Sequence, residues 1–165
     1  METIQQAVAD ACDMGYDVDL HFVVGAPEET WYDILESLAI VKKYPIYDFG
    51  FNNLIPYPKT ELYNWVKKNK YFTIQPSTYF NDIPYWQNDP VFETPIFSLE
   101  ERKKAISKAL KLKTKVKIRY FKHKFKKYGF IGYIIAYAAA MSFVRDRLLK
   151  NARIKKIALG IFQRV

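Results

Sequence analysis

The spacing of apolar residues predicts alternating helices and strands over the first 70 positions. An apolar stripe at helical spacing begins at Ile4, and Gly15 ends that helix. Residues 18–24 then alternate in period two, which is typical of a strand. A second helix begins after Thr30, a favourable capping residue, and ends before Pro45.

The same reasoning predicts a second strand through Phe49 and Phe51 to Ile55, and a third helix that begins at Thr60. Helix, strand, helix, strand and helix with short connections are typical of a parallel α/β sheet. Two strands cannot close a barrel or fill a doubly wound sheet, so we expect a piece of a larger (β/α) structure. A small isolated α/β unit is the alternative.

The rest of the chain follows a different pattern. Residues 71–97 are rich in Pro, Tyr and Asn without a sustained period, which predicts an ordered irregular segment or a linker. A capping box at 98–101 opens a long basic helix. The expected regions are therefore an α/β portion at 1–70, an irregular aromatic segment at 71–97 and a mostly helical basic extension at 98–165.

Charge divides the chain in the same way. The net charge of +9 combines a first part, residues 1–100, with 15 acidic and 6 basic side chains, and a second part, residues 101–165, with 2 acidic and 20 basic ones. Such a division indicates that the second part faces polyanions or an acidic partner.

Cysteine usage sets a further limit. Cys12 is the only cysteine, so no disulfide forms within the chain, which fits a reducing, cytoplasmic location. No signal peptide is visible at the start. An iron–sulfur cluster needs three or four thiolates, which one cysteine cannot supply.

The segment 25–30 follows a strand and precedes a helix, where α/β folds place their ligand sites. Gly25 would let a flat ligand approach the backbone closely. A tight turn with a good helix cap is the alternative interpretation.

Two runs resemble radical S-adenosylmethionine enzymes. Residues 19–30, DLHFVVGAPEET, resemble the fifth strand and following loop of that family, where a G-x-I-x-G-x-x-E pattern packs against the adenine of the cofactor. Residues 53–63, NLIPYPKTELY, resemble the sixth-strand run PYPGTELY of the subgroup that carries an amino-terminal cobalamin-binding domain. Both runs come in the family's order and at its spacing.

This resemblance implies the carboxy-terminal part of a partial (β/α) TIM-like barrel, with S-adenosylmethionine as the cofactor. The positions that match the cofactor pattern, together with a polar residue near the end of the second strand, are His21, Val23, Gly25, Glu28 and Asn53. His21 stands where the family has Gly, and Lys59 replaces the Gly of PGT. By alternation, the side of the first strand opposite His21 is wholly apolar, as expected for a barrel's helix-covered outside.

The family's CxxxCxxC loop and the cobalamin domain are not in this sequence. The resemblance therefore implies a fragment that is inactive alone, whose partners are the missing amino-terminal barrel half and cobalamin domain. The 4Fe-4S cluster and cobalamin belong only to a full-length protein, which would methylate a carbon, form a ring or oxidise its substrate. A truncated reading frame is preferred to a short protein that works beside another chain.

The alternative function is that of a non-catalytic protein whose basic tail binds a membrane surface or nucleic acid. Residues 102–127 carry 13 Lys or Arg, and residues 128–144 carry no charge. As a helix this uncharged run spans about 25 Å, short of the ~30 Å hydrocarbon core, so a helical hairpin that lies in the interface or docks internally is expected. An anionic membrane surface, at the inner face of the membrane, is favoured over internal docking, and both are favoured over nucleic acid.

Overall fold

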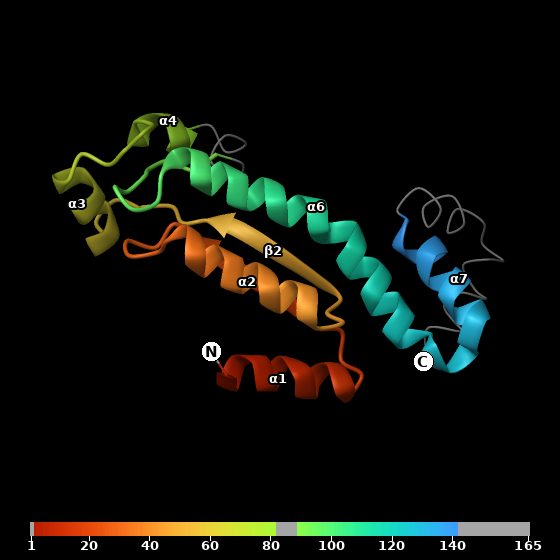
Figure 1. Cartoon of the computed structure of the whole chain (residues 1–165). Coiled ribbons are helices and arrows are strands. Elements are labelled where there is room, and N and C mark those ends of the chain that lie inside the picture. The colour runs from red at the N-terminus through yellow and green to blue at the C-terminus, as the bar shows by residue number, and fades with distance from the viewer. Residues whose placement is uncertain (1, 82–88, 142–165) are drawn as a thin grey trace. The chain divides into compact units, whose positions relative to one another are not determined.

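The structure, a computed structural model, describes residues 2–81 and 89–141. The protein is a mixed α/β chain whose sheet has two parallel strands. In chain order the elements are α1 (Glu2–Asp13), β1 (Asp19–Val24), α2 (Trp31–Lys43), β2 (Asp48–Asn53), α3 (Glu61–Lys68), α4 (Pro76–Asn81), α6 (Leu99–Lys124), the 3-10 helix η1 (Lys126–Tyr128) and α7 (Gly129–Ala140) (Figure 1).

The helices and strands predicted for the first 70 residues are confirmed, as is the long basic helix α6. Among its described residues, the segment 71–97 contains a short helix, α4, that the absence of a period did not predict. Pro76 suits the first position of this helix, because proline's fixed φ is already helical and its missing N–H has no helical partner to lose. Of the uncharged run at 128–144, residues 142–144 lie outside the described residues.

The chain divides into two compact units. Of the described residues, the strand unit comprises 20–40, 49–81 and 89–111. The hairpin unit comprises 2–19, 41–48 and 112–141. The two long helices α2 and α6 each contribute residues to both units, and each unit is described by itself below.

The two faces of the sheet in the strand unit differ in polarity. On one face, Val24 is buried and Phe22 stacks on Phe51 at 4.7 Å between ring centroids. On the other face, His21 is exposed and Val23 is 57% exposed. The apolar face of the first strand is therefore covered and the mixed face is open, as the alternation of the sequence predicted.

Aromatic residues form a second core in the strand unit, around Val66, Tyr79, Val91 and Phe92. The hydroxyl of Tyr79 donates to the carbonyl of Pro56 at 2.7 Å, and burial raises the pKa of Tyr79 to about 12. This hydrogen bond satisfies a polar group that would otherwise be costly to bury. The described part of the aromatic segment is therefore packed against α3.

In the hairpin unit, the end of α6 turns through η1 into α7, and the two helices pack against each other (Figure 1). The contact is formed by three aromatic residues, Tyr120 and Phe121 of α6 and Phe125 directly after it, which pack against Ala136 of α7. Gly132 of α7 is buried, and a Cβ at this position would collide with the carbonyl oxygen of Phe125. The absence of a side chain at Gly132 therefore lets α7 approach the end of α6.

Several basic side chains of α6 have partners within the hairpin unit. Arg119 donates to the carbonyl oxygens of Val41 at 3.0 Å and Tyr44 at 3.4 Å, at the end of α2, where helix carbonyls have no helical partner. Asp48 forms ion pairs with Lys113 at 2.6 Å and Lys117 at 3.6 Å. Part of the basic run thus stabilises the fold.

Within residues 2–81 and 89–141, we find no helix with both the length and the apolar character needed to cross a bilayer.

Gly132→Ala tests the helix contact. On an unconstrained helix this change stabilises by about 1 kcal/mol, because alanine has the higher helix propensity. Here we expect a loss of about 1–3 kcal/mol in the free energy of unfolding of the full chain, because the methyl group forces α7 away from Phe125. Urea unfolding followed by circular dichroism measures the sign, and a more stable variant would show that the two helices are not in contact.

Candidate functional site

The loop that follows β1 is held in place at Gly25, whose backbone N–H and carbonyl group are both hydrogen-bonded. This residue has a φ of 110°, which favours glycine. Its N–H donates to the carboxylate of Glu29, and its carbonyl oxygen accepts a hydrogen bond from Nη1 of Arg102 at 3.4 Å. The loop at the carboxyl end of the strand is therefore fixed by a pair of opposite charges.

Arg102 is the largest fully buried side chain among the described residues, at 1% exposure. Its guanidinium carbon lies 4.4 Å from the ring centroid of Phe92 and 5.1 Å from that of Phe97, and Nε donates to the carbonyl of Phe97 at 3.2 Å. Burial lowers the pKa of Arg102 to about 10, against the opposing charges of Glu29 and Glu93. The group therefore keeps its positive charge at neutral pH.

Arg102 also explains why residue 25 is glycine. A Cβ at Gly25 would collide with Nη1 of Arg102. The sequence had suggested that this glycine admits a flat ligand, whereas the close approach seen in the strand unit is made by a side chain of the same chain. A bound molecule would then contact the loop beside Arg102.

The carboxylate of Glu29 is engaged within its own loop, where it accepts the hydrogen bond from the N–H of Gly25. Burial raises the pKa of Glu29, although the N–H of Gly25 and the charge of Arg102 act in the opposite direction. The N-terminus of α2 is capped instead by Thr30 and Asp33, since the N–H and hydroxyl of Thr30 donate to Asp33 at 2.8 and 2.7 Å.

The sequence-predicted site residues lie on different surfaces of the strand unit. His21 and Val23 are on the open face of the sheet, and Glu28 is exposed in the loop. Gly25 and Asn53 both lie at the carboxyl end of the strand pair, since Gly25 follows β1 and Asn53 is the last residue of β2. The carboxylate that bonds to Gly25 belongs to Glu29, one position after the predicted Glu28.

Buried polar atoms without a hydrogen-bond partner gather at this end. In the described ranges they are Oδ1 and Nδ2 of Asn53 and Nη2 of Arg102. Arg102 reaches this end because its guanidinium bonds to Gly25. Buried polar groups in native proteins are almost always hydrogen-bonded. These three atoms therefore mark a place in the strand unit where buried polar groups lack a hydrogen-bond partner among the described residues.

A second candidate site is a polar pocket of about 210 Å³ in the hairpin unit. Its ionisable lining residues are Asp13, Asp17, His123, Lys124, Lys126 and Lys127. Burial lowers the pKa of His123, and the charge of Lys126 lowers it further. The lysines outnumber the carboxylates, so the pocket favours an anion weakly.

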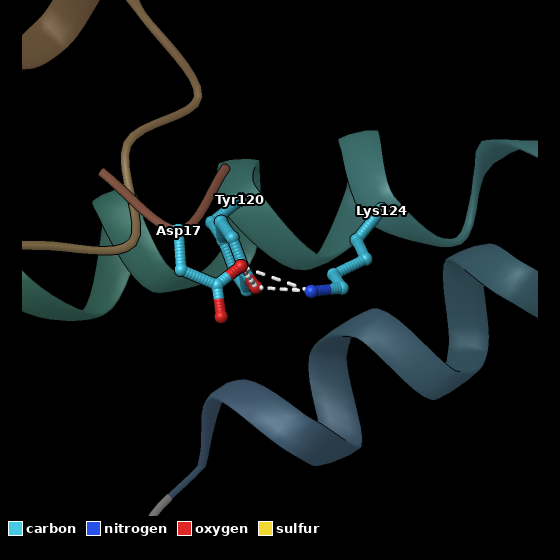
Figure 2. Close-up of polar contacts among 3 residues, drawn as sticks. All are labelled: Asp17, Tyr120 and Lys124. Atoms are coloured by element: carbon cyan, nitrogen blue, oxygen red, sulfur yellow. Dashed lines mark hydrogen bonds and ion pairs between the residues drawn. The ribbon is translucent and has the colours of Figure 1, made fainter. Parts of the chain in front are cut away.

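One wall of this pocket is a three-residue hydrogen-bonded cluster, shown in Figure 2. The hydroxyl of Tyr120 donates to Oδ1 of Asp17 at 2.5 Å, and Nζ of Lys124 lies 2.9 Å from each of these two oxygens. Burial raises the pKa of Tyr120, and the carboxylate of Asp17 raises it further. Tyr120 therefore stays neutral at physiological pH, and the cluster links the loop before β1 to α6 without supplying a base.

Cys12, which also lines the pocket, is buried, and burial together with the charge of Asp13 raises the pKa of its thiol. The thiol is therefore protonated at neutral pH and a poor nucleophile. Across residues 2–81 and 89–141, no three His, Cys, Asp or Glu side chains are grouped so that they could hold a metal ion.

Asp17→Asn tests the cluster through its pH dependence. Partial burial raises the pKa of Asp17, but hydrogen bonds from Tyr120 and Lys124 outweigh it and lower the pKa below its ordinary 3.8. A lowered pKa stabilises the fold above pH 3.8, and this contribution is lost as the pH falls further. We expect the variant to lose about 0.5 kcal/mol at pH 7, a small effect because the carboxylate is half exposed.

Thermal unfolding of the full chain between pH 2.5 and 7 measures this difference. The gap between wild type and Asp17→Asn should close below pH 3.8, whereas Asp13→Asn, another aspartate that lines the same pocket, should show a smaller gap at pH 7. A gap of constant size across the range would contradict the ionic part of the interaction.

No protein-family model matches this chain, and no curated protein matches it.

Proposed function

We propose that the strand unit forms the adenosyl-binding side of a radical S-adenosylmethionine enzyme, as the carboxy-terminal part of its partial (β/α) barrel. The resemblance of residues 19–30 and 53–63 to that family suggests the cofactor. The observation that carries the proposal is the group of unpaired, buried polar atoms on Asn53 and Arg102, at the carboxyl end of two parallel strands. Open α/β sheets bind their ligands at this end.

The chemistry of these atoms fits an adenosyl group. The side-chain amide of Asn53 offers both a donor and an acceptor, which is what the edge of an adenine ring or a ribose hydroxyl requires. Nη2 of Arg102 offers a further donor. The hydrogen bonds of Gly25 to Glu29 and Arg102 fix the backbone beside these groups. Because the three polar atoms are buried, the side chains that cover them would have to move for an adenosyl group to reach them.

The sheet itself supports a barrel fragment. In the described part of the chain each strand has a single neighbour, so the pair has an unpaired edge on either side. The exposed face with His21 and Val23 would point into a barrel, and the covered face with Val24 would remain outside against helices. Asn53 shares the covered face with Phe51, so its amide would meet the adenosyl group at the carboxyl end of the strands and not from the inside of the barrel. Further strands from a longer protein would pair with the open edges of the sheet and enclose its exposed face.

The residues of this chain would bind and orient the adenosyl group and shield it from water. S-adenosylmethionine, when bound, supplies the radical chemistry, which in the full-length protein would lead to methylation, ring formation or oxidation. A 4Fe-4S cluster does not fit the residues present, because Cys12 is the only thiol and is buried. We therefore assign neither this cluster nor cobalamin a ligand in this chain.

Asn53→Ala tests the proposed site, and Asn52→Ala, which changes the same residue type one position earlier, is its control. The probe is S-adenosylhomocysteine, observed by saturation-transfer NMR with the full chain. We expect weak binding, in the millimolar range typical of a partial site with few contacts. Asn53→Ala should weaken it about tenfold, since one or two hydrogen bonds are lost. Asn52→Ala should have a smaller effect, because the side chain of Asn52 lies on the opposite face of β2 from that of Asn53.

Asn53→Leu separates binding from stability. Removing an unpaired buried amide should leave the free energy of unfolding unchanged or raise it by about 1 kcal/mol, while binding of the probe is lost. Loss of stability in this variant would mean that the amide already has a partner in the folded chain. Equal binding by Asn52→Ala and Asn53→Ala would refute the assignment of the site.

A cluster reconstitution tests the fragment hypothesis. Anaerobic treatment of this chain with iron and sulfide should give no four-iron chromophore, because one thiol cannot replace three. The same chain extended by the sequence encoded before Met1 should contain a CxxxCxxC motif and give the chromophore after reconstitution. A stoichiometric cluster in the chain alone, or an upstream sequence without that motif, would contradict the proposal.

A further inference from the structure

The helix α7 carries most of its large side chains on the outside, and Ile135 is the large residue that packs against the end of α6. Phe130 is 78% exposed, Ile131 66% and Ile134 56%, whereas Gly132 and Ala136 are buried. A helix of a water-soluble domain normally has the opposite arrangement, with its large apolar residues toward the core. No residue of α7 is charged.

This orientation is fixed by packing. Ala136 contacts the aromatic cluster of Tyr120, Phe121 and Phe125, and a side chain at Gly132 would collide with the carbonyl of Phe125. Rotation of α7 about its axis to bury Ile131 and Ile134 would place larger side chains where only glycine and alanine fit. The exposed face is therefore imposed by the contact with α6.

Cationic side chains border this apolar face. Lys126 and Lys127, both exposed, precede α7 directly. Nζ of Lys122 lies 4.1 Å from the ring centroid of Tyr133 and 3.1 Å from the hydroxyl of Tyr137, on the exposed side of α7. Lys113, Lys117 and Lys124 have carboxylate partners within the unit. Lys126 and Lys127 thus place two exposed cationic side chains at the start of α7.

We propose that α7 lies on an anionic lipid bilayer, with Phe130, Ile131 and Ile134 in the acyl boundary and Lys126 and Lys127 at the phosphates. The helix has 12 residues and spans about 18 Å, so it lies along the surface and does not cross it. This surface is independent of the proposed adenosyl site, since it lies in the other unit.

The charges favour lipid over other occupants. Residues 101–165 carry 20 basic and 2 acidic side chains, so a second copy of the chain on the same face would bring like charges together. Nucleic acid would use the lysines and leave the isoleucine face exposed. An anionic bilayer satisfies both features, because polybasic segments and buried apolar side chains act together in membrane attachment.

Flotation with vesicles tests the proposal on the full chain. The chain should float with vesicles of equal parts phosphatidylcholine and phosphatidylglycerol, and bind vesicles of phosphatidylcholine alone at least about tenfold more weakly. At about 1 M salt, where charges are screened beyond ~3 Å, a residual affinity should persist from the apolar face.

Two pairs of matched variants separate the contribution of the apolar face to vesicle binding from that of the lysines. Ile131→Ser with Ile134→Ser should remove the residual binding at high salt, whereas Ile96→Ser with Leu110→Ser, equally exposed but in the strand unit, should not. Lys126→Gln with Lys127→Gln should weaken binding to anionic vesicles about 30-fold at low salt. Lys67→Gln with Lys68→Gln, exposed on α3, should leave it nearly unchanged. Circular dichroism checks that each variant is folded.

Failure to float with anionic vesicles at low salt would overturn the proposal. The same holds if the Ile131/Ile134 variant and the Ile96/Leu110 variant reduce binding equally, or if binding disappears entirely at high salt, as counterion release alone would predict. Size-exclusion chromatography provides the remaining outcome: a dimer that Ile131→Ser with Ile134→Ser dissociates would assign the face to a second copy of the chain.

Discussion

The buried charge of Arg102 is the constraint on which the strand unit depends. A guanidinium at 1% exposure is tolerated only where most of its donors and its charge find partners. Here two aromatic rings, two backbone carbonyls and nearby carboxylates supply them, and only Nη2 is left without a hydrogen bond among the described residues. These contacts join the start of α6, the segment around Phe97 and the loop after β1. They also require glycine at position 25, since any Cβ there would occupy the place of the guanidinium.

A different constraint governs the hairpin unit. The close contact between Gly132 and the carbonyl of Phe125 determines which face of α7 is turned inward, and most of the large apolar residues remain outside as a consequence. The basic character of α6 is divided in the same unit. Lys113, Lys117 and Arg119 are bound to partners at the end of α2 and the start of β2. The net charge of this region therefore overstates the number of cationic side chains that are available to bind an external anion.

The elements were predictable because their signals are local. Period two around Phe22 and the capping residues near Thr30 depend on neighbours in the chain, and β1 and α2 form where these signals place them. The hydrogen bond of Arg102 to Gly25 was missed, because it joins residues 77 positions apart. One signal was available: among the 13 basic residues at 102–127, the two arginines are those that donate to backbone carbonyls, as arginine's planar group suits buried sites.

The sequence by itself determined the order of helices and strands, the alternation that makes one side of β1 apolar, and the division of charge between the two parts of the chain. The tertiary structure alone decided that Asn53 and Arg102 have buried atoms without partners at one end of the sheet, and that α7 turns Ile131 and Ile134 outward. Periodicity reports which residues share a face of one element. It does not report which face a neighbouring element covers, because that depends on how closely two backbones can approach, as at Gly132 and Phe125.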